Sequence, residues 1–402
     1  MSIYFNISKF PHDPILGLTE EFNKDPRKIK LNLGVGVYLD EDGKIPVLNS
    51  VAAASNIIFD LFKNRGGYLP IGGVTKHTEL VKTLLLGAER SINSHNKLTT
   101  VQALGGTGGL RLGAELLKRV IPSTSVYISN PSWENHRNIF EAAGFPVKEY
   151  PYYNPENNSL NMADYLDTLR HVPSRSVIVL HACCHNPTGI DPSKAQWTEI
   201  LNVFKEKGHI PFLDLAYQGF NGTVEEDAEV VRLFSESLET VFIANSFSKN
   251  MSLYGERIGA CTVSAANTKD QQKILSHLKN IIRGIYSSPP SFGQQIVSQI
   301  LEKDNLRNQW EEELKHMRSR IVRIRNSLFL QLQEKNLNLD LSFIKKQKGM
   351  FSYSGLSAQH VDKLKYDYGI YVLSSGRICM AAINDSNLEY VAESIASVLE
   401  GS

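Results

Sequence analysis

The sequence predicts an α/β protein. A large domain with a mainly parallel mixed sheet flanked by helices is joined by a long helix to a smaller α+β domain. Three observations lead to this class. Short apolar runs alternate with longer amphipathic runs through the middle of the chain, as in open α/β sheets. A later stretch keeps apolar residues at helical spacing over many turns. With 402 residues, the chain is also long enough for two domains.

The predicted strands are short apolar runs, and helix-like stretches lie between several of them. The strands cover residues 124–129, 176–182, 209–216, 240–245 and 258–263. The stretch SKAQWTEILNVFKEKG at 193–208 is typical of a helix, because it ends in a basic turn followed by a glycine. This alternation predicts parallel strands joined by helical crossovers.

A long helix is predicted at residues 306–335. Its apolar positions repeat at helical spacing: Trp310, Leu314, Met317, Ile321, Ile324 and Leu328. The segments after it, which include IYVLSSGRICMAAI and the final NLEYVAESIASVLEG, predict a small α+β unit. We therefore expect a large domain at 41–309. The small domain is expected from 1–40 and 310–402, with an N-terminal arm.

Composition excludes several classes of protein. Lys and Arg number 43 against 42 Asp and Glu, so charge gives no sign of a nucleic-acid or membrane partner. The first residues lack the pattern of a secretory signal, and no apolar run approaches a membrane span. The spacing of Cys183, Cys184, Cys261 and Cys379 matches neither a disulfide framework nor a zinc site. A reducing cytoplasm is the expected location.

Polar side chains gather where the predicted strands end, and ligands of open α/β sheets bind beyond the carboxyl ends of strands. Four strand ends contribute. The residues are Asn130, Pro131 and Trp133; His185, Asn186 and Pro187; Asp214 and Tyr217; and Ser246, Ser248 and Lys249. Together they predict one site at the edge of the sheet.

A glycine-rich turn, GGTGG at 105–109, leads directly into an amphipathic helix. Free backbone N–H groups and the helix dipole at such a start suit a phosphate, and Thr107 adds a hydroxyl. Taken alone, the motif is more often a simple tight turn.

Three chemical requirements converge on these residues. A phosphate needs the glycine turn, a hydroxyl and an arginine such as Arg257. A carbonyl needs the amine of Lys249, which can form a Schiff base. A buried carboxylate such as Asp214 can keep a ring nitrogen protonated. Pyridoxal phosphate has all three groups.

Seven motifs then resemble the aspartate aminotransferases, within the fold-type I family of pyridoxal phosphate enzymes. The motifs occur in order over almost the whole chain. They are LNLGVGVY, YLPIGG, NPSWENH, HACCHNPTG, DLAYQGF, SFSKNMSLYGERIG and SGRICMAAI. Any one of them alone would be weak, but the ordered set is highly specific.

The resemblance implies roles for individual residues. Lys249 would hold the cofactor covalently and carry the transferred proton, and Asp214 would pair with the pyridine nitrogen. Tyr217 and Asn186 would hydrogen-bond the ring's phenolic oxygen. Trp133 would stack on the ring and border the substrate.

The resemblance also implies binding groups for phosphate and substrate. The phosphate would be held by Gly106, Thr107, Ser246 and Arg257, with Tyr68 reaching in from a second subunit. Arg377 would bind the substrate α-carboxylate beside Gly36 and Asn186. Arg283 would cross a homodimer interface to the side-chain carboxylate.

Two further expectations come from the resemblance. The peptide bonds Asn130-Pro131 and Asn186-Pro187 are both expected to be cis. Gly105 stands where family members often have Ser, which removes one hydroxyl from the phosphate loop.

Each of these residues also has a plainer interpretation. Lysine and arginine usually lie at surfaces, and Tyr217 and Trp133 could simply pack a core. His136, His181 and His185 lack a metal-binding constellation, so we expect supporting or structural roles and no metal site. Cys183 and Cys184 are expected to be buried and inert.

Three classes of function therefore compete. The leading hypothesis is an aminotransferase that moves an amino group between L-aspartate and 2-oxoglutarate, giving oxaloacetate and L-glutamate in a ping-pong reaction. The second is another pyridoxal phosphate enzyme, such as an aromatic or broad-range aminotransferase or a lyase. Arg283 discriminates, because a dicarboxylate specialist needs a second cation. The third is a non-catalytic relic, against which the retention of Lys249, Asp214 and Arg377 argues.

Overall fold

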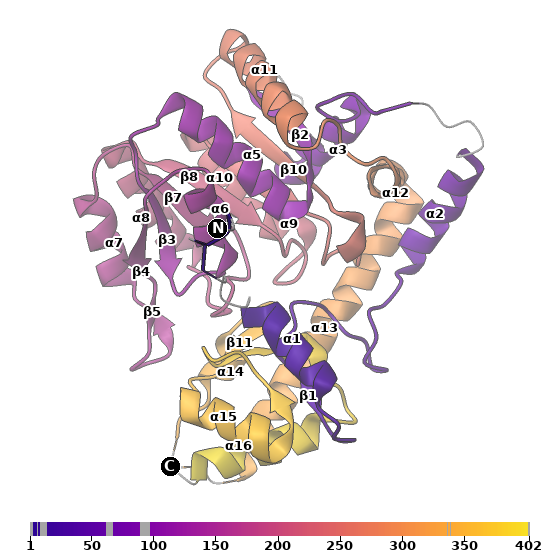
Figure 1. Ribbon diagram of the computed structural model, residues 1–402, viewed down its shortest axis with the longest axis vertical. Coiled ribbons are helices and arrows are strands. Elements are labelled where there is room, and N and C mark those ends of the chain that lie inside the picture. The colour runs from indigo at the N-terminus through magenta and orange to yellow at the C-terminus, as the bar shows by residue number, and fades with distance from the viewer. Residues whose placement is uncertain are drawn as a thin grey trace.

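The computed structural model describes residues 3–5, 7–8, 14–61, 67–88, 97–335, 337 and 339–400. Figure 1 shows an upper lobe built around a sheet and a lower lobe that contains the C-terminal segments together with α1 (Pro14–Lys24). The long helix α13 (Asp304–Glu334) runs from one lobe to the other. The arm predicted at the N-terminus lies largely outside the described residues.

The upper lobe contains a seven-stranded sheet in the order β2-β10-β9-β8-β7-β3-β4. All strands run parallel except β10, which is antiparallel to both of its neighbours. Their bounds are β2 (Leu98–Leu104), β3 (Val126–Asn130), β4 (Val147–Pro151), β7 (Val177–His181), β8 (Ile210–Leu215), β9 (Phe242–Ser246) and β10 (Ile258–Ser264). The mainly parallel mixed sheet is therefore confirmed, and β2 and β4 are additions to the five strands predicted.

Helices cover both faces of this sheet (Figure 1). The helices of the upper lobe are α2 (Asn49–Leu61), α3 (Thr75–Leu86), α5 (Gly105–Val120), α6 (Asn135–Ala142), α7 (Met162–His171), α8 (Lys194–Lys207), α9 (Val224–Asp227), α10 (Glu229–Ser237), α11 (Thr268–Ile285) and α12 (Phe292–Glu302). Of these, α2 and α12 pack against each other and against α13, to the side of the sheet. A small hairpin of β5 (Tyr153–Asn154) and β6 (Ser159–Leu160) follows β4, the strand at one edge of the sheet.

The helix predicted at 193–208 is α8, and its ends show why it forms there. The Ser193 hydroxyl accepts from the N–H of Gln196, whose side chain accepts in return from the N–H of Ser193. This capping box satisfies two backbone donors at the start of the helix. Gly208, at φ 66°, ends it in the left-handed conformation that glycine adopts without strain.

Helix α5 lies unusually close to the sheet because two of its positions are glycines. A Cβ on Gly113 would lie 2.4 Å from the ring of Phe212, and one on Gly109 would lie 2.7 Å from the carbonyl oxygen of Ala260. Any larger residue at either position would push the helix away. The close approach places the first turn of α5 directly at the edge of the sheet, where the predicted site lies.

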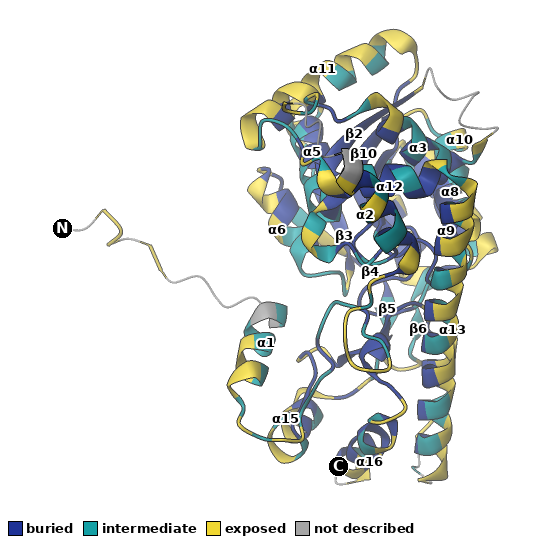
Figure 2. Cartoon of the chain, turned by 90° about the vertical axis from the view of Figure 1, so that its right-hand side faces the viewer, coloured by how far each residue is buried: buried dark blue, intermediate teal, exposed yellow. Residues whose placement is uncertain are grey.

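Helix α13 begins two residues before its predicted start. Its apolar positions are buried, and Figure 2 shows a buried side and an exposed side along its length. The lower lobe holds β1 (Leu31–Asn32), α14 (Phe343–Lys346), β11 (Phe351–Tyr353), α15 (Ala358–Tyr368), β12 (Ile370–Tyr371), β13 (Arg377–Cys379) and α16 (Leu388–Glu400). β1 pairs in parallel with β12, and β11 pairs antiparallel with β13.

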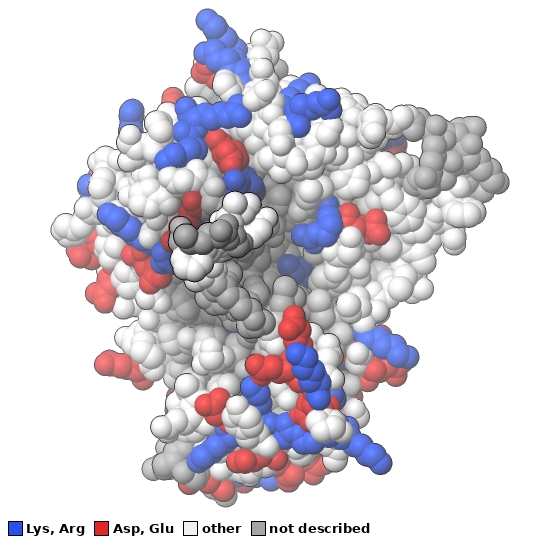
Figure 3. Space-filling model, viewed as in Figure 1, with Lys and Arg blue, Asp and Glu red and all other residues white. Residues whose placement is uncertain are grey.

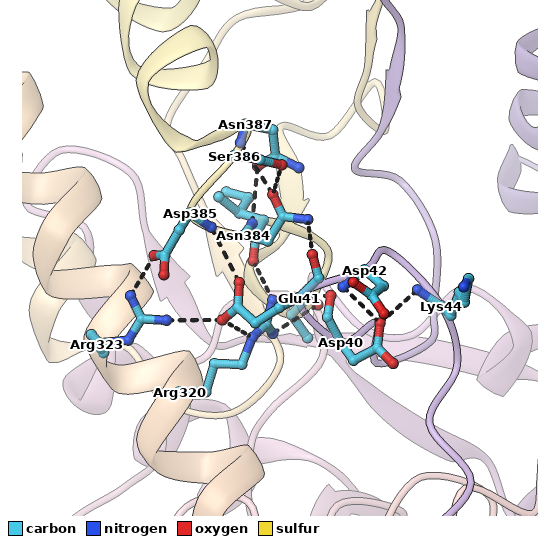
Figure 4. A network of polar contacts seen from close by, with 12 residues as sticks. Asp40, Glu41, Asp42, Lys44, Arg320, Arg323, Asn384, Asp385, Ser386 and Asn387 are labelled. Carbon is cyan, nitrogen blue, oxygen red and sulfur yellow. Dashed lines mark hydrogen bonds and ion pairs between the residues drawn. The ribbon is translucent and has the colours of Figure 1, made fainter.

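A polar network fastens the segment around residue 41 to α13 and to the turn before α16 (Figure 4). The Glu41 carboxylate accepts from Arg320 Nε at 2.7 Å and from Arg323 Nη2 at 2.8 Å. Arg323 also pairs with Asp385, and the Asn384 amide donates to the Glu41 carbonyl oxygen. The network therefore ties the N-terminal segment to the C-terminal lobe across more than 270 residues of sequence.

The charged side chains form no field of one sign on the face shown in Figure 3, where Lys and Arg intermix with Asp and Glu. No helix among the described residues combines the length and apolar character needed to cross a membrane.

Candidate active site

A cavity of about 240 Å³ opens at the edge of the sheet where the parallel strands end. Its wall contains eleven of the thirteen predicted site residues: Gly36, Gly106, Thr107, Trp133, Asn186, Asp214, Tyr217, Ser246, Lys249, Arg257 and Arg377. Segments from both lobes and from the loop between β9 and β10 therefore meet around one space.

Strand direction explains this convergence. β7, β8 and β9 run parallel, so the residues after His181, Leu215 and Ser246 leave the sheet at the same edge. β10 is antiparallel, so its first residues, not its last, lie at that edge. Arg257 directly precedes β10 and is thereby brought to the end of the strand that leads to Lys249.

One end of the cavity is suited to an anion. The first turn of α5 contributes Gly106 and Thr107, whose backbone N–H groups point out of the helix start. Ser246 Oγ donates to Ser248 Oγ at 3.1 Å, and Arg257 lies beside them on the same wall. These donors, with a guanidinium and a helix N-terminus, form a phosphate-type site.

The backbone conformation and the neighbours of Gly105 explain why this position is a glycine. Its φ is 67°, and a Cβ there would lie 2.7 Å from Nη2 of Arg257. A serine at this position would be strained and would displace the guanidinium. The phosphate loop therefore lacks a serine hydroxyl at position 105 because Arg257 lies too close for a side chain there.

Lys249 lies in the middle of the cavity wall. Its Nζ is 5.2 Å from the centre of the Tyr217 ring. Burial lowers the pKa of Lys249 to about 8, and although the Asp214 carboxylate opposes this, Arg257 and Arg377 add to it. A lysine with this pKa has a far larger neutral fraction near pH 7 than an ordinary one, and the neutral amine is the nucleophile.

Asp214 supplies a buried negative charge at the end of β8. Only 4% of the residue is exposed, and His136 Nε2 donates to its Oδ2 at 3.0 Å. Burial raises the pKa of Asp214, but the hydrogen bond and charge of His136 outweigh this and leave it below its usual value. The carboxylate therefore stays ionised without a lysine or arginine bound directly to it.

Of the three predicted histidines, His181 lines the cavity, whereas His136 and His185 are not on its wall. His136 Nδ1 lies 2.9 Å from Ser132 Oγ, and its ring packs 4.9 Å from that of His181. His185 bridges the hydroxyls of Ser129 and Thr188, at 2.9 and 2.8 Å. Burial lowers the pKa of His181 to about 3, so this ring is neutral. His136, His181 and Asp214 lie close enough together to resemble a ligand set, but His136 already donates to the carboxylate.

Arg377 is a second arginine on the cavity wall. It is 1% exposed, and its Nη2 donates to the Gly34 carbonyl oxygen at 2.7 Å and its Nη1 to Asn186 Oδ1 at 3.2 Å. Its guanidinium carbon lies 4.2 Å from the centre of the Phe351 ring. The buried Nε has no hydrogen-bond partner within the described chain. A buried guanidinium with no carboxylate bound to it is suited to an incoming carboxylate.

Two predicted residues lie away from this cavity. Tyr68 is 97% exposed. Arg283 is in the last turn of α11, where its guanidinium donates to the Ser287 hydroxyl. Both lie outside the wall that the rest of the subunit forms.

Four wall residues were not predicted: Ile15, Ala216, Tyr254 and Phe351. The Tyr254 hydroxyl accepts from the N–H of Tyr38 at 2.9 Å, which joins the lysine loop to the segment that carries Gly36. Arg320 stacks over the Tyr38 ring at 5.3 Å. Tyr254 was visible within the motif SLYGERIG, whereas nothing local to Ile15 or Phe351 marked them as wall residues.

The two expected cis bonds are both present, at Asn130-Pro131 and Asn186-Pro187. All four cysteines are buried and free. A hydrogen bond with the neighbouring Cys184, together with burial, raises the pKa of Cys183 well above its usual value. Burial also raises the pKa of the other three cysteines, so the thiols remain protonated.

Comparisons with known proteins agree with this geometry. A model of the family described as Aminotransferase class I and II matches residues 28–395. An aspartate aminotransferase of Pseudomonas aeruginosa is 49% identical over 399 residues, covering 99% of this chain and 100% of its own.

Solved structures agree as well. The aromatic-amino-acid aminotransferase of Burkholderia pseudomallei, covalently bound to pyridoxal phosphate, superimposes with a TM-score of 0.96 at 47% identity, over 99% of this chain and 100% of its own. The cytoplasmic aspartate aminotransferase of Saccharomyces cerevisiae gives a TM-score of 0.97 at 36% identity, over 99% of each chain. With this match of sequence, fold and cavity, the chain belongs to the class I and II aminotransferases.

Proposed function

We propose that this chain is an aspartate aminotransferase that uses pyridoxal phosphate. One observation carries the proposal: a lysine amine, a buried carboxylate, an anion site and a buried arginine surround a single cavity. A relative named aspartate aminotransferase, 49% identical over nearly the whole chain, supports the same reaction. The reaction exchanges the amino group of L-aspartate with 2-oxoglutarate, giving oxaloacetate and L-glutamate.

The cavity fits the cofactor at both of its ends. The start of α5, with Thr107, Ser246 and Arg257, suits a phosphate, and a side chain at Gly106 would be crowded, because its Cβ would lie 3.3 Å from Ser246 Cβ. Asp214 provides the negative charge that a pyridinium nitrogen needs. When bound, the cofactor draws electrons away from the substrate Cα–H bond.

The protein's own groups then have separate tasks. Lys249 would hold the cofactor, and its Nζ would move a proton from the substrate Cα. Asn186 Nδ2 and the Tyr217 hydroxyl, 3.5 Å apart, together bind the ring's phenolic oxygen. Trp133, on the same cavity wall, would cover a face of the ring. Arg377 binds the α-carboxylate, with Gly36 beside it on the cavity wall.

The proposal includes a homodimer with shared sites. Tyr68 and Arg283 lie outside the cavity of their own subunit, and a two-fold interface would let each one complete the other copy's cavity. In this arrangement Tyr68 of the partner subunit reaches the phosphate, and Arg283 of the partner subunit reaches the distal carboxylate. The proposal also keeps a large domain at 41–309 and a small domain of 1–40 with 310–402, in a cytoplasm where the four buried cysteines stay reduced.

An aromatic aminotransferase is the second candidate. The Burkholderia structure of that name is 47% identical and covers nearly the whole chain. The cavity wall also presents Trp133, Tyr254 and Phe351, which offer apolar surface to a ring. The two candidates differ in whether a second cation selects the substrate.

Substrate choice is tested by Arg283→Ala. Charged hydrogen bonds contribute about 1.5–3 kcal/mol each, so losing a bidentate pair costs roughly 3–6 kcal/mol of transition-state binding. We expect kcat/KM for aspartate to fall by at least about a hundredfold, since each factor of ten is about 1.4 kcal/mol. Turnover of alanine and phenylalanine changes far less, because neither carries the second carboxylate. Steady-state kinetics with the three amino acids measure this.

Lys273→Ala is the matched control, because Lys273 is an exposed cation of the same helix that pairs with Asp270. We expect Lys273→Ala to leave kcat/KM for all three amino acids at wild-type values. Arg377→Ala lowers kcat/KM for every amino acid, because all of them carry the α-carboxylate. If Arg283→Ala reduces kcat/KM for aspartate and for alanine equally, Arg283 does not select the substrate. The aromatic aminotransferase is then the better supported candidate.

The shared site is tested by mixing Arg283→Ala with Lys249→Ala, each inactive toward aspartate. In a hybrid dimer one cavity has both its own Lys249 and an intact Arg283 of the partner subunit. Random exchange of equal amounts makes half of the dimers hybrids with one competent site, so about a quarter of wild-type activity returns. Native mass spectrometry verifies the exchange. Hybrids that form but stay inactive would show that the subunits do not share sites.

A further inference from the structure

Arg325 is a buried arginine in the middle of α13. It is 2% exposed, and no ion pair joins it to a carboxylate in the ranges that the structure describes. Its neighbours on the buried side of the helix are apolar, including Ile321, Ile324 and Leu328. An arginine is a costly choice at such a position, because its charge must be taken out of water.

Both Nη atoms of Arg325 donate to carbonyl oxygens of one segment. Nη1 donates to Ile344 at 3.2 Å, and Nη2 donates to Gly349 and Phe351, both at 2.9 Å. Burial lowers the pKa of Arg325 to about 10, so the group remains charged at neutral pH. One guanidinium thus fixes the backbone from the end of α14 to the first residue of β11.

This segment carries the ring that packs on Arg377. Phe351 lines the cavity, its ring centre lies 4.2 Å from the Arg377 guanidinium carbon, and its edge contacts Tyr217 at 5.8 Å. β11 also pairs with β13, in a register that places Tyr353 opposite Arg377. The carbonyl that Arg325 holds therefore belongs to the residue that packs against the guanidinium of Arg377.

The same segment supports the loop that carries Asn186. The N–H of Lys348 donates to the Gly189 carbonyl oxygen at 2.6 Å. Gly349, at φ 72°, lies so close to Cys184 that a Cβ would be 2.6 Å from Cys184 Cβ. Asn186 Oδ1 in turn accepts from Arg377 Nη1 at 3.2 Å. Arg325 thus restrains two of the groups that orient Arg377, namely Phe351 and Asn186.

We propose that Arg325 is a positioning residue for carboxylate binding. Through the backbone of residues 344–351, it holds Arg377 in the orientation that receives the substrate α-carboxylate. This inference rests on the proposed function, because that function makes Arg377 the α-carboxylate site. Arg325 itself touches neither substrate nor cofactor, as it is absent from the cavity wall.

The test uses holoenzyme carrying Arg325→Met, Arg325→Lys or Leu328→Ala. Arg325→Met keeps an unbranched apolar stem but removes the charge and every donor, whereas Arg325→Lys keeps the charge and an ammonium donor. Leu328→Ala is the matched control, because Leu328 is 1% exposed on the same helix and its truncation destabilises the core without contacting residues 344–351 through hydrogen bonds. Four quantities are measured: the Kd of succinate by calorimetry, KM and kcat for aspartate and alanine, and the melting temperature.

We expect Arg325→Met to raise the Kd of succinate and the KM of both amino acids by about 10-fold to 100-fold, the cost of a misplaced binding group. Its kcat falls less than about threefold, since Lys249 and Asp214 are untouched. Arg325→Lys recovers a large part of the affinity. Leu328→Ala lowers the melting temperature but leaves the Kd and KM at wild-type values.

Wild-type affinity in folded Arg325→Met overturns the proposal, and so does an equal loss of affinity in Leu328→Ala. If Arg325→Met does not fold, Arg325→Lys decides: a Kd raised about threefold to tenfold supports the assignment, and an unchanged Kd overturns it. If the wild-type protein binds succinate but does not transaminate aspartate, the proposed function fails. The succinate Kd values still decide the role of Arg325.

Discussion

Lys249→Ala is expected to abolish transamination while the protein still folds. The amine both holds the cofactor and moves the proton, so we expect kcat to fall by about 10⁴-fold, the upper end of what a positioned proton carrier contributes. The side chain faces the cavity, and its burial already disfavours the charged form, so its loss costs little packing. Borohydride reduction followed by peptide mass spectrometry should find the cofactor adduct on Lys249 in the wild-type protein and no adduct in the variant.

Lys82→Ala is the matched control. Lys82 is also buried, at 7% exposure, but pairs with Glu79 at 2.7 Å and lies outside the cavity. Its replacement leaves turnover and the adduct unchanged. An adduct on any other lysine of the wild-type protein would show that Lys249 does not hold the cofactor. Circular dichroism of Lys249→Ala shows whether its loss of activity is accompanied by unfolding.

Asp214→Asn should bind the cofactor and lose most of its activity. The substitution keeps the shape of the side chain and removes its negative charge, which the structure holds ionised against burial. Removing one partner of a buried charge pair costs about 2–5 kcal/mol, so we expect kcat/KM for aspartate to fall by about 10²–10³-fold. Visible absorbance during a pH titration of the holoenzyme measures whether the ring nitrogen still holds its proton at pH 7.

Asp227→Asn controls for the loss of a buried aspartate. Asp227 is 3% exposed, and its carboxylate accepts from the N–H groups of Gly219, Asn221 and Gly222. Its replacement disturbs that turn and lowers stability without lowering kcat. Near-normal turnover in Asp214→Asn would show that the carboxylate does not support the ring nitrogen.

The sheet shows where local pattern is sufficient. The five predicted strands occur within two residues of their predicted bounds, because each is a short apolar run that ends in polar residues. β2 escaped prediction because its sequence, LTTVQAL, mixes polar residues into a strand that is buried along most of its length. β4 escaped because VKEYP has an exposed centre and lies at the sheet edge. A continuous run of apolar residues predicts a buried strand, and neither β2 nor β4 has such a run.

The site shows a similar division. Six of the predicted site residues could be expected around one cavity from strand ends alone, because the carboxyl ends of parallel strands converge whatever their order. They are Trp133, Asn186, Asp214, Tyr217, Ser246 and Lys249. Gly36 and Arg377 were expected only from the resemblance. The location of Arg257 depended on β10 running antiparallel, and that of Phe351 on its register against β13. Both are pairings between segments, and no periodicity within one segment encodes them.

The amino-acid sequence by itself predicted the fold class, the long helix and the strand ends at which Lys249 and Asp214 lie. These predictions follow from residue chemistry and from patterns a few residues long. The two cis bonds were predicted from the resemblance. Only the tertiary structure decided which groups surround Arg377, how Arg325 reaches β11, and why Tyr68 and Arg283 lie apart from the cavity. Those facts depend on contacts between residues far apart in the chain, whose distances are set by the packing of the two lobes against α13.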